Sequence, residues 1–139
     1  MIDLRVPATA STIVEERLCE ELGSATERME RLRFLRAHLS YLAFCRLMWD
    51  ANPSFNQHEI DRVSSEMEAL ADRETDWSWR ERFERDLILP LRDFQQITRA
   101  RSERPDLKLA EWHEQAYRTL FAGWKRLYHQ ERLEQRLAP

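Results

Sequence analysis

Glycine is scarce in this sequence, because 139 residues include only Gly23 and Gly123, where average usage would give about ten. β-Sandwiches, barrels and dinucleotide-binding sheets place glycine at tight turns and where the backbone approaches a ligand. Loops that cradle phosphates have the same requirement. The scarcity argues against these folds and against P-loop and dinucleotide chemistry. An all-α fold is the class that remains.

Cysteines and long apolar runs are also scarce. Cys19 and Cys45 lack Cys-x-x-Cys spacing, so we expect reduced thiols rather than a disulfide framework. The N-terminus shows no basic head followed by an apolar stretch, so no signal peptide is predicted. The longest nearly apolar run, Tyr41 to Trp49, contains Arg46 and is far shorter than the roughly 20 residues that span a bilayer. We therefore expect a cytoplasmic protein with no membrane partner.

The sequence lacks the usual spacings of metal and catalytic sites. The four histidines are His38, His58, His113 and His129, and no two are three or four residues apart. Neither Glu-x-x-His nor His-x-x-x-His occurs, so we predict no metal and no cofactor. The serines are interpreted as helix caps, and Cys45 lies in an apolar stretch that keeps a thiol protonated. We predict no catalytic residue, and hence no enzyme.

Helix-capping signals are frequent. Capping boxes occur at Thr12-x-x-Glu15, Ser24-x-x-Glu27, Ser54-x-x-Gln57 and Ser78-x-x-Glu81, and Asp106 can cap a further helix. They predict a short helix over 12–22 and long helices over 24–49, from 54 to a break at 73–76, from 78 to about 104, and from 106 to about 137. Pro90 lies inside the fourth predicted helix and should kink it.

Short connections between amphipathic helices favour antiparallel neighbours. The apolar positions of the third predicted helix are Ile60, Val63, Met67 and Leu70, at helical spacing. We predict one domain over 1–139 with an N-terminal arm over 1–10. Its expected fold is an antiparallel helical bundle of four long helices plus a short N-terminal helix.

Two tryptophans lie in a predicted turn and have no local packing partner. A hydrophobic staple would pair Trp77 with position 82, but that residue is Arg82. Tryptophan and arginine together are typical of interface hot spots, although a tryptophan could instead cap the end of the core. Leu133 and Leu137 lie at the charged end of the last helix, where a partner would bury them. The predicted partner-binding residues are Trp77, Trp79, Arg80, Arg82, Leu133 and Leu137.

The basic residues suggest a second use of the surface. Net charge is −3 and the basic residues are 20 arginines and two lysines, which argues against a general DNA coat protein. Arginine is nevertheless well suited to phosphate contacts. The chain is similar in general outline to the helical small subunits of CRISPR effector complexes. This resemblance implies a nucleic-acid-contacting face, for which the candidates are Arg92, Arg99, Arg101, Arg104 and Lys108.

Two further features have alternative interpretations. Arg46 interrupts an apolar segment, so we expect it to reach solvent or to pair with a carboxylate on a facing helix. The candidate partners are Glu66, Glu68, Asp72, Asp86 and Asp93. The segment from Arg33 to His38 resembles the Arg-x4-6-His signature of HEPN ribonucleases. That resemblance implies RNA cleavage at a cleft where Arg33 and His38 of paired subunits meet.

These observations lead to three functional hypotheses. The leading one is a non-catalytic protein–protein interaction protein: an adaptor, an accessory or small subunit of a larger complex, or a dedicated chaperone. It requires a protein partner, which includes a second copy in a homodimer. The alternatives are a nucleic-acid-contacting small subunit and a HEPN-like ribonuclease.

Overall fold

The structure is a computed structural model that describes residues 25–138. Its helices are α2 (Ala25–Leu47), α3 (Pro53–Ala71), α4 (Trp77–Phe83), the π-helical η1 (Glu84–Ile88), α5 (Leu89–Glu103) and α6 (Ala110–Leu137). No strand occurs among the described residues, so the prediction of an all-α fold is confirmed for them. The predicted arm over 1–10, the helix over 12–22 and the boxes at Thr12 and Ser24 lie outside the described residues.

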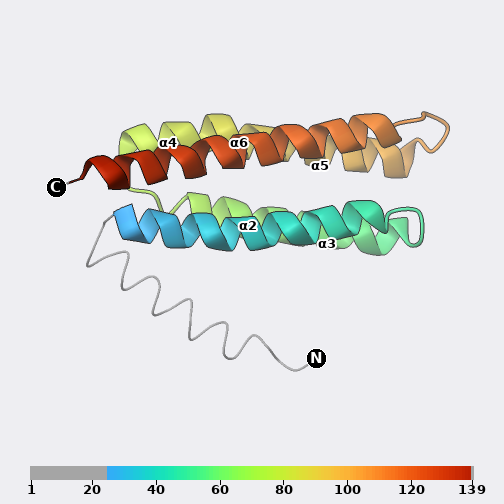
Figure 1. The fold of residues 1–139 in the computed structure, drawn as a ribbon. Helices are drawn as coiled ribbons and strands as arrows, with labels where there is room; N and C mark the ends of the chain where they lie inside the picture. The colour runs from blue at the N-terminus through green and yellow to red at the C-terminus, as the bar shows by residue number, and fades with distance from the viewer. Residues whose placement is uncertain (1–24, 139) are drawn as a thin grey trace, which may run out of the picture.

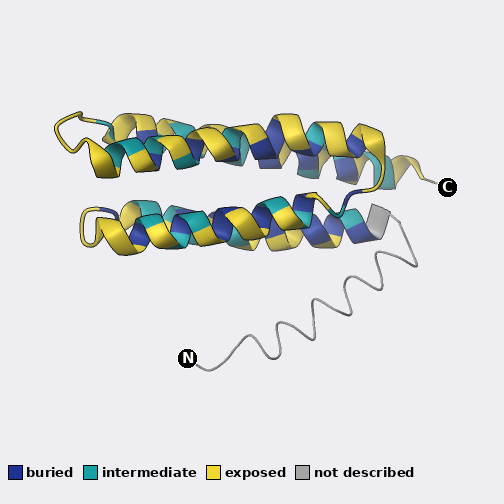
Figure 2. Ribbon diagram, turned by 180° about the vertical axis from the view of Figure 1, so that it is seen from behind, coloured by how far each residue is buried: buried dark blue, intermediate teal, exposed yellow. Residues whose placement is uncertain are grey.

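The helices form a bundle whose connections lie at its two ends (Figure 1). α4, η1 and α5 follow one another without a break, so this part of the chain forms one long helical segment. α2 packs against α3 and α6, and α5 packs against the same two helices. Buried residues follow the inward sides of the helices (Figure 2). Among the described helices, none combines the length and apolarity needed to cross a membrane.

The core consists of the apolar stripes of the four helical segments. In α3 the predicted positions Ile60, Val63 and Met67 are buried, and Leu70 is partly buried. The fully buried side chains from all segments include Leu32, Leu35, Leu39, Leu42, Phe83, Leu87, Leu91, Phe94, Leu120 and Leu127. The continuous stripe provides the hydrophobic stabilisation that holds the helices together.

Three of the predicted helix caps are wrong. The α3 cap is Asn52, whose Oδ1 accepts the Phe55 N–H at 3.2 Å; Ser54 lies inside the first turn after Pro53. The α4 cap is Asp76, whose side chain accepts hydrogen bonds from the backbone N–H groups of Ser78 and Trp79. In each case Asn or Asp preceded the expected serine and caps as well as serine does. Asp106 instead pairs with Arg104, at 2.9 Å, and α6 begins at Ala110.

A π-helical turn lies just before Pro90, where the sequence predicts a kink. The Leu89 N–H bonds to the Glu84 carbonyl, one residue farther back than in an α-helix. Pro90 has no N–H, so the Asp86 carbonyl lacks the donor that a regular helix would supply. That carbonyl faces Gly123 of α6 so closely that a Cβ on Gly123 would lie 1.6 Å from it. A side chain larger than hydrogen cannot fit there.

We expect Gly123→Ala to destabilise the protein. In an ordinary helix the same change stabilises by about 0.8–1 kcal/mol. Here the methyl group would collide with backbone rather than with a movable side chain. Overpacking of this kind costs roughly 1–3 kcal/mol. Urea denaturation of the full chain measures the difference.

Ala122→Gly, in the neighbouring position of α6, is the matched control for this test. It should lower the free energy of unfolding only by the difference in intrinsic helix propensity between alanine and glycine. A Gly123→Ala variant as stable as the wild type would show that the two helices do not meet through backbone at this point.

Candidate interaction surface

Most of the predicted partner-binding residues lie at one end of the bundle, where α4 begins and α6 ends (Figure 1). Trp77 is 71% exposed, Leu133 49% and Leu137 75%. Arg82 lies in the last turn of α4, where its guanidinium pairs with Glu134 of α6 at 3.1 Å. We call Trp77, Arg82, Leu133 and Leu137 the end surface. These residues share one end of the bundle although they are up to 60 positions apart in sequence.

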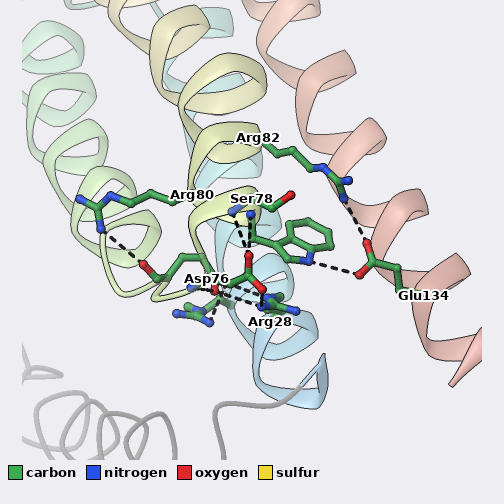
Figure 3. Close-up of polar contacts among 9 residues, drawn as sticks. Arg28, Asp76, Ser78, Arg80, Arg82 and Glu134 are labelled. Carbon is green, nitrogen blue, oxygen red and sulfur yellow. Dashed lines mark hydrogen bonds and ion pairs between the residues drawn. The ribbon is translucent and has the colours of Figure 1, made fainter. Parts of the chain in front are cut away.

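Trp79 is a correction, because its side chain is buried, with only 2% exposed, and cannot be the first contact of a partner. Its indole ring lies between the guanidinium groups of Arg28 and Arg82, whose carbons are 5.1 and 5.2 Å from the ring centroid. The indole N–H donates to Glu134 at 3.3 Å (Figure 3). Trp79 therefore caps the end of the core, the alternative that the sequence left open.

A buried carboxylate, Glu74, ties this end together. It accepts hydrogen bonds from Arg28 at 2.8 and 3.2 Å, from Arg31 at 3.3 Å and from the Asp76 N–H at 2.9 Å. Arg80 braces the same connection by donating to the backbone and side chain of Asp72 (Figure 3). Two of these six residues come from α2 and four from the α3–α4 connection and α4. The loop before Trp77 is thereby held in one conformation.

A basic groove runs beside the end surface, between α4–η1 and α6. Its volume is about 580 Å³, and its lining includes Arg82, Arg85, Asp86, Arg126, His129 and Leu133. Asp86 accepts two hydrogen bonds from Arg85, each 3.1 Å, and one from Arg126 at 3.3 Å. The single negative charge of Asp86 is shared between two positively charged guanidinium groups, so the groove keeps an excess of positive charge.

The sequence analysis did not single out Arg85, Arg126 or His129. A usable signal existed, because Arg82 and Arg85 are three residues apart on one helix, as are Arg126 and His129 on another. Residues at this spacing share a helix face. Only the packing of α6 against η1 shows that the two faces adjoin.

Glu131 is the most unusual ionisable group at this end. It continues the buried stripe of α6 and is fully buried. Burial raises its pKa from an ordinary 4.5 to about 7; the charges of Glu134 and Glu74 add to the rise, and Arg28 opposes it. The carboxyl is thus protonated in weak acid, where its neutral form is compatible with an apolar site.

We expect Glu131→Gln to stabilise the protein in weak base and to change little in weak acid. The Glu131 carboxyl has a higher pKa in the folded than in the unfolded chain. Its contribution to stability is therefore fully present at pH values below the unfolded pKa of 4.5 and is lost as the pH rises through about 7. Glutamine cannot ionise, so the melting temperature of the variant should exceed that of the wild type by several degrees near pH 8 and match it near pH 5. Thermal denaturation at the two pH values measures this.

Glu111→Gln, an exposed change on the same helix, should show no such difference between the two pH values. Equal effects of Glu131→Gln at both pH values would contradict the burial of an ionisable carboxyl at this position.

The predicted nucleic-acid face is largely neutralised by ion pairs within the chain. Arg92 pairs with Glu68 at 3.2 Å, and Arg99 with Asp61 at 3.4 Å. The remaining two arginines do the same: Arg101 with Asp50 at 3.1 Å and Arg104 with Asp106 at 2.9 Å. Of this set only Lys108 makes no ion pair with a described residue. The paired carboxylates reduce the net positive charge that this face presents to phosphates.

His113 is a core residue at the opposite end of the bundle. It is fully buried, with its ring 5.2 Å from that of Trp49 and 5.1 Å from that of Phe94. Burial lowers its pKa from an ordinary 6.5 to about 4, and the charges of Arg101 and Arg46 lower it further. Within residues 25–138 no three His, Cys, Asp or Glu side chains gather as a metal site.

The other two sequence features are explained by local contacts. Arg46 is partly buried, with 19% of its side chain exposed, and pairs with Glu114 of α6 at 3.5 Å, so none of the carboxylates proposed for it is its partner. Arg33 pairs with Glu30, whereas the His38 ring contacts Glu66 of α3. Five residues along a helix turn the side chain by about 140°, so Arg33 and His38 do not converge within one chain.

Comparison with known proteins identifies no relative. No protein-family model, no curated protein and no solved structure matches the chain.

Proposed function

We propose that this chain is a non-catalytic protein–protein interaction protein that binds its partner through the end surface. The observation that supports this is the concentration of exposed Trp77, Leu133 and Leu137 at one end, beside a basic groove. Large apolar side chains with arginine at their edge are the composition of interface hot spots. An adaptor, an accessory or small subunit of a larger complex, or a dedicated chaperone would present such a surface.

The rigidity of the site supports the same proposal. Glu74 and Asp76 hold the start of α4 through several hydrogen bonds, so Trp77 is presented from an ordered turn. A preorganised surface binds without the entropic cost of ordering a loop. The architecture we propose is the antiparallel bundle of four long helices, with the short helix over 12–22 added. We propose a cytoplasmic protein that binds another protein, a second copy of the chain included.

The two alternatives receive less support. A nucleic-acid-contacting small subunit would need free cations, and the arginines proposed for that role are ion-paired. A HEPN-like ribonuclease would need Arg33 and His38 of paired subunits at one cleft, and in the chain these two side chains contact Glu30 and Glu66.

Replacing Trp77 and Leu133 together by alanine should abolish partner capture. The tagged full chain would be recovered from its native cells after photo-crosslinking through a reactive residue at position 137. We expect at least one protein to co-purify in stoichiometric amount with the wild type and to fall about tenfold or more with the double variant, because hot-spot truncations each cost roughly 2 kcal/mol.

The matched control is Leu107→Ala combined with Trp112→Ala. These residues are of the same types, 42% and 65% exposed, but lie at the opposite end of the bundle. The control should capture the partner as the wild type does. Equal recovery with both double variants would exclude the end surface as the binding site.

A further inference from the structure

A row of stacked aromatic rings runs along the edge of α6 that faces α2. Consecutive rings of Tyr117, Phe121, Trp124 and Tyr128 have centroids 6.4, 5.9 and 5.0 Å apart, and their planes are within 18° of parallel. The row is anchored to α2, because the Trp124 indole donates to the Leu32 carbonyl at 2.8 Å. The two helices lie side by side at the front of Figure 1.

Three exposed cations lie over this row, and we call them the basic seam. The Arg36 guanidinium of α2 is 4.8 Å from the Phe121 ring centroid, and the Lys125 ammonium is 5.5 Å from the same ring. The Arg132 guanidinium is 5.8 Å from the Tyr128 ring. None of the three makes an ion pair with any described residue. This separates them from Arg92, Arg99, Arg101 and Arg104, which carboxylates of the chain neutralise.

The cations are arranged as an approaching helix would require. Lys125 and Arg132 are seven residues apart on α6, which places them about 10 Å apart along one side of the helix. Arg36 reaches over the rings from the other helix. Carboxylates seven residues apart on a second helix repeat at the same interval, as in the flanking positions of a coiled coil. Stacked arginine keeps its in-plane N–H groups for such carboxylates; Arg36 uses one for the Ser40 hydroxyl, at 2.8 Å.

We propose that the basic seam binds an acidic amphipathic helix of a partner protein, which lies along α2 and α6 with its carboxylates on Arg36, Lys125 and Arg132. Its apolar side would cover the exposed edges of Phe121 and Tyr128, which are only partly buried.

A protein fits this surface better than a single-stranded nucleic acid. Bases bind by stacking on open ring faces, and here Arg36 already lies over the rings of Phe121 and Trp124, and Lys125 over that of Phe121. The basic seam can still form ion pairs with a partner, and these suit a helix that carries carboxylates. The net charge of −3 also offers no general attraction for phosphates.

The basic seam is separate from the end surface. Its α6 residues lie on the side toward α2, whereas the groove that contains Arg126 and Leu133 lies toward η1. The two proposals can therefore fail independently.

The test uses the full chain and a fluorescent helical peptide of about 21 residues, with glutamate at three successive heptad positions beside a leucine stripe. Fluorescence anisotropy should show that the affinity for the peptide is about tenfold lower or more in the triple variant Arg36→Gln, Lys125→Gln, Arg132→Gln. The control Arg92→Gln, Arg99→Gln, Arg104→Gln changes the charge equally and should alter binding by less than about twofold. A peptide of the same composition with its glutamates off the heptad should bind more weakly.

The double variant Lys125→Gln, Arg132→Gln leaves Arg36 on its ring and should weaken binding in the same direction, with the wild-type circular dichroism spectrum. Trp77→Ala with Leu133→Ala should bind the peptide as the wild type does. Equal losses in the seam and control variants would overturn the proposal, as would equal binding of the two peptides. Tighter binding of a uridine oligonucleotide than of the acidic peptide would also overturn it, in favour of nucleic acid.

Discussion

The contact between the Asp86 carbonyl and Gly123 determines how α6 lies on the rest of the bundle. Pro90 leaves that carbonyl without its helical donor, the backbone adopts a π turn around it, and α6 approaches through Gly123, which has no Cβ. The same turn carries the Asp86 side chain to Arg85 and Arg126. The groove beside the end surface therefore depends on a backbone contact in the middle of the bundle.

Buried ionisable groups occupy the two ends of the molecule and have opposite preferences. Glu131, with a pKa of about 7, is neutral in acid, and His113, with a pKa of about 4, is neutral in base. Both side chains are uncharged only at pH values between about 4 and about 7, so their combined contribution to stability is greatest in weak acid. Other buried charges are neutralised by ion pairs; the Glu74 carboxylate, for example, accepts hydrogen bonds from both Arg28 and Arg31. The basic seam stands out because none of its three cations makes an ion pair with a described residue.

Local pattern predicted the fold class and much of the core. Ile60, Val63 and Met67 are buried as their spacing required, and so are Phe83 and Leu91. The caps were less predictable, because Asn52 and Asp76 compete with Ser54 and Ser78 for the same role and the local backbone decides between them. The sequence left open whether Trp77 and Trp79 face a partner or cap the core; Trp77 is exposed, whereas Trp79, two residues later, is buried beside Arg28 and Arg82 of the folded chain.

Sequence alone settled those properties that depend on residues within a turn or two of one another: helix formation, the buried stripes and the exclusion of glycine-dependent folds. Which charges neutralise one another was decided by tertiary structure, because Arg46 finds Glu114 and Arg101 finds Asp50 across helices. Coulomb attraction acts through space, at a few ångströms, whatever the separation along the chain. Which described cations keep no ion pair is therefore a property of the packed helices, and the basic seam emerges only there, whereas the residues of the end surface were predicted from the sequence.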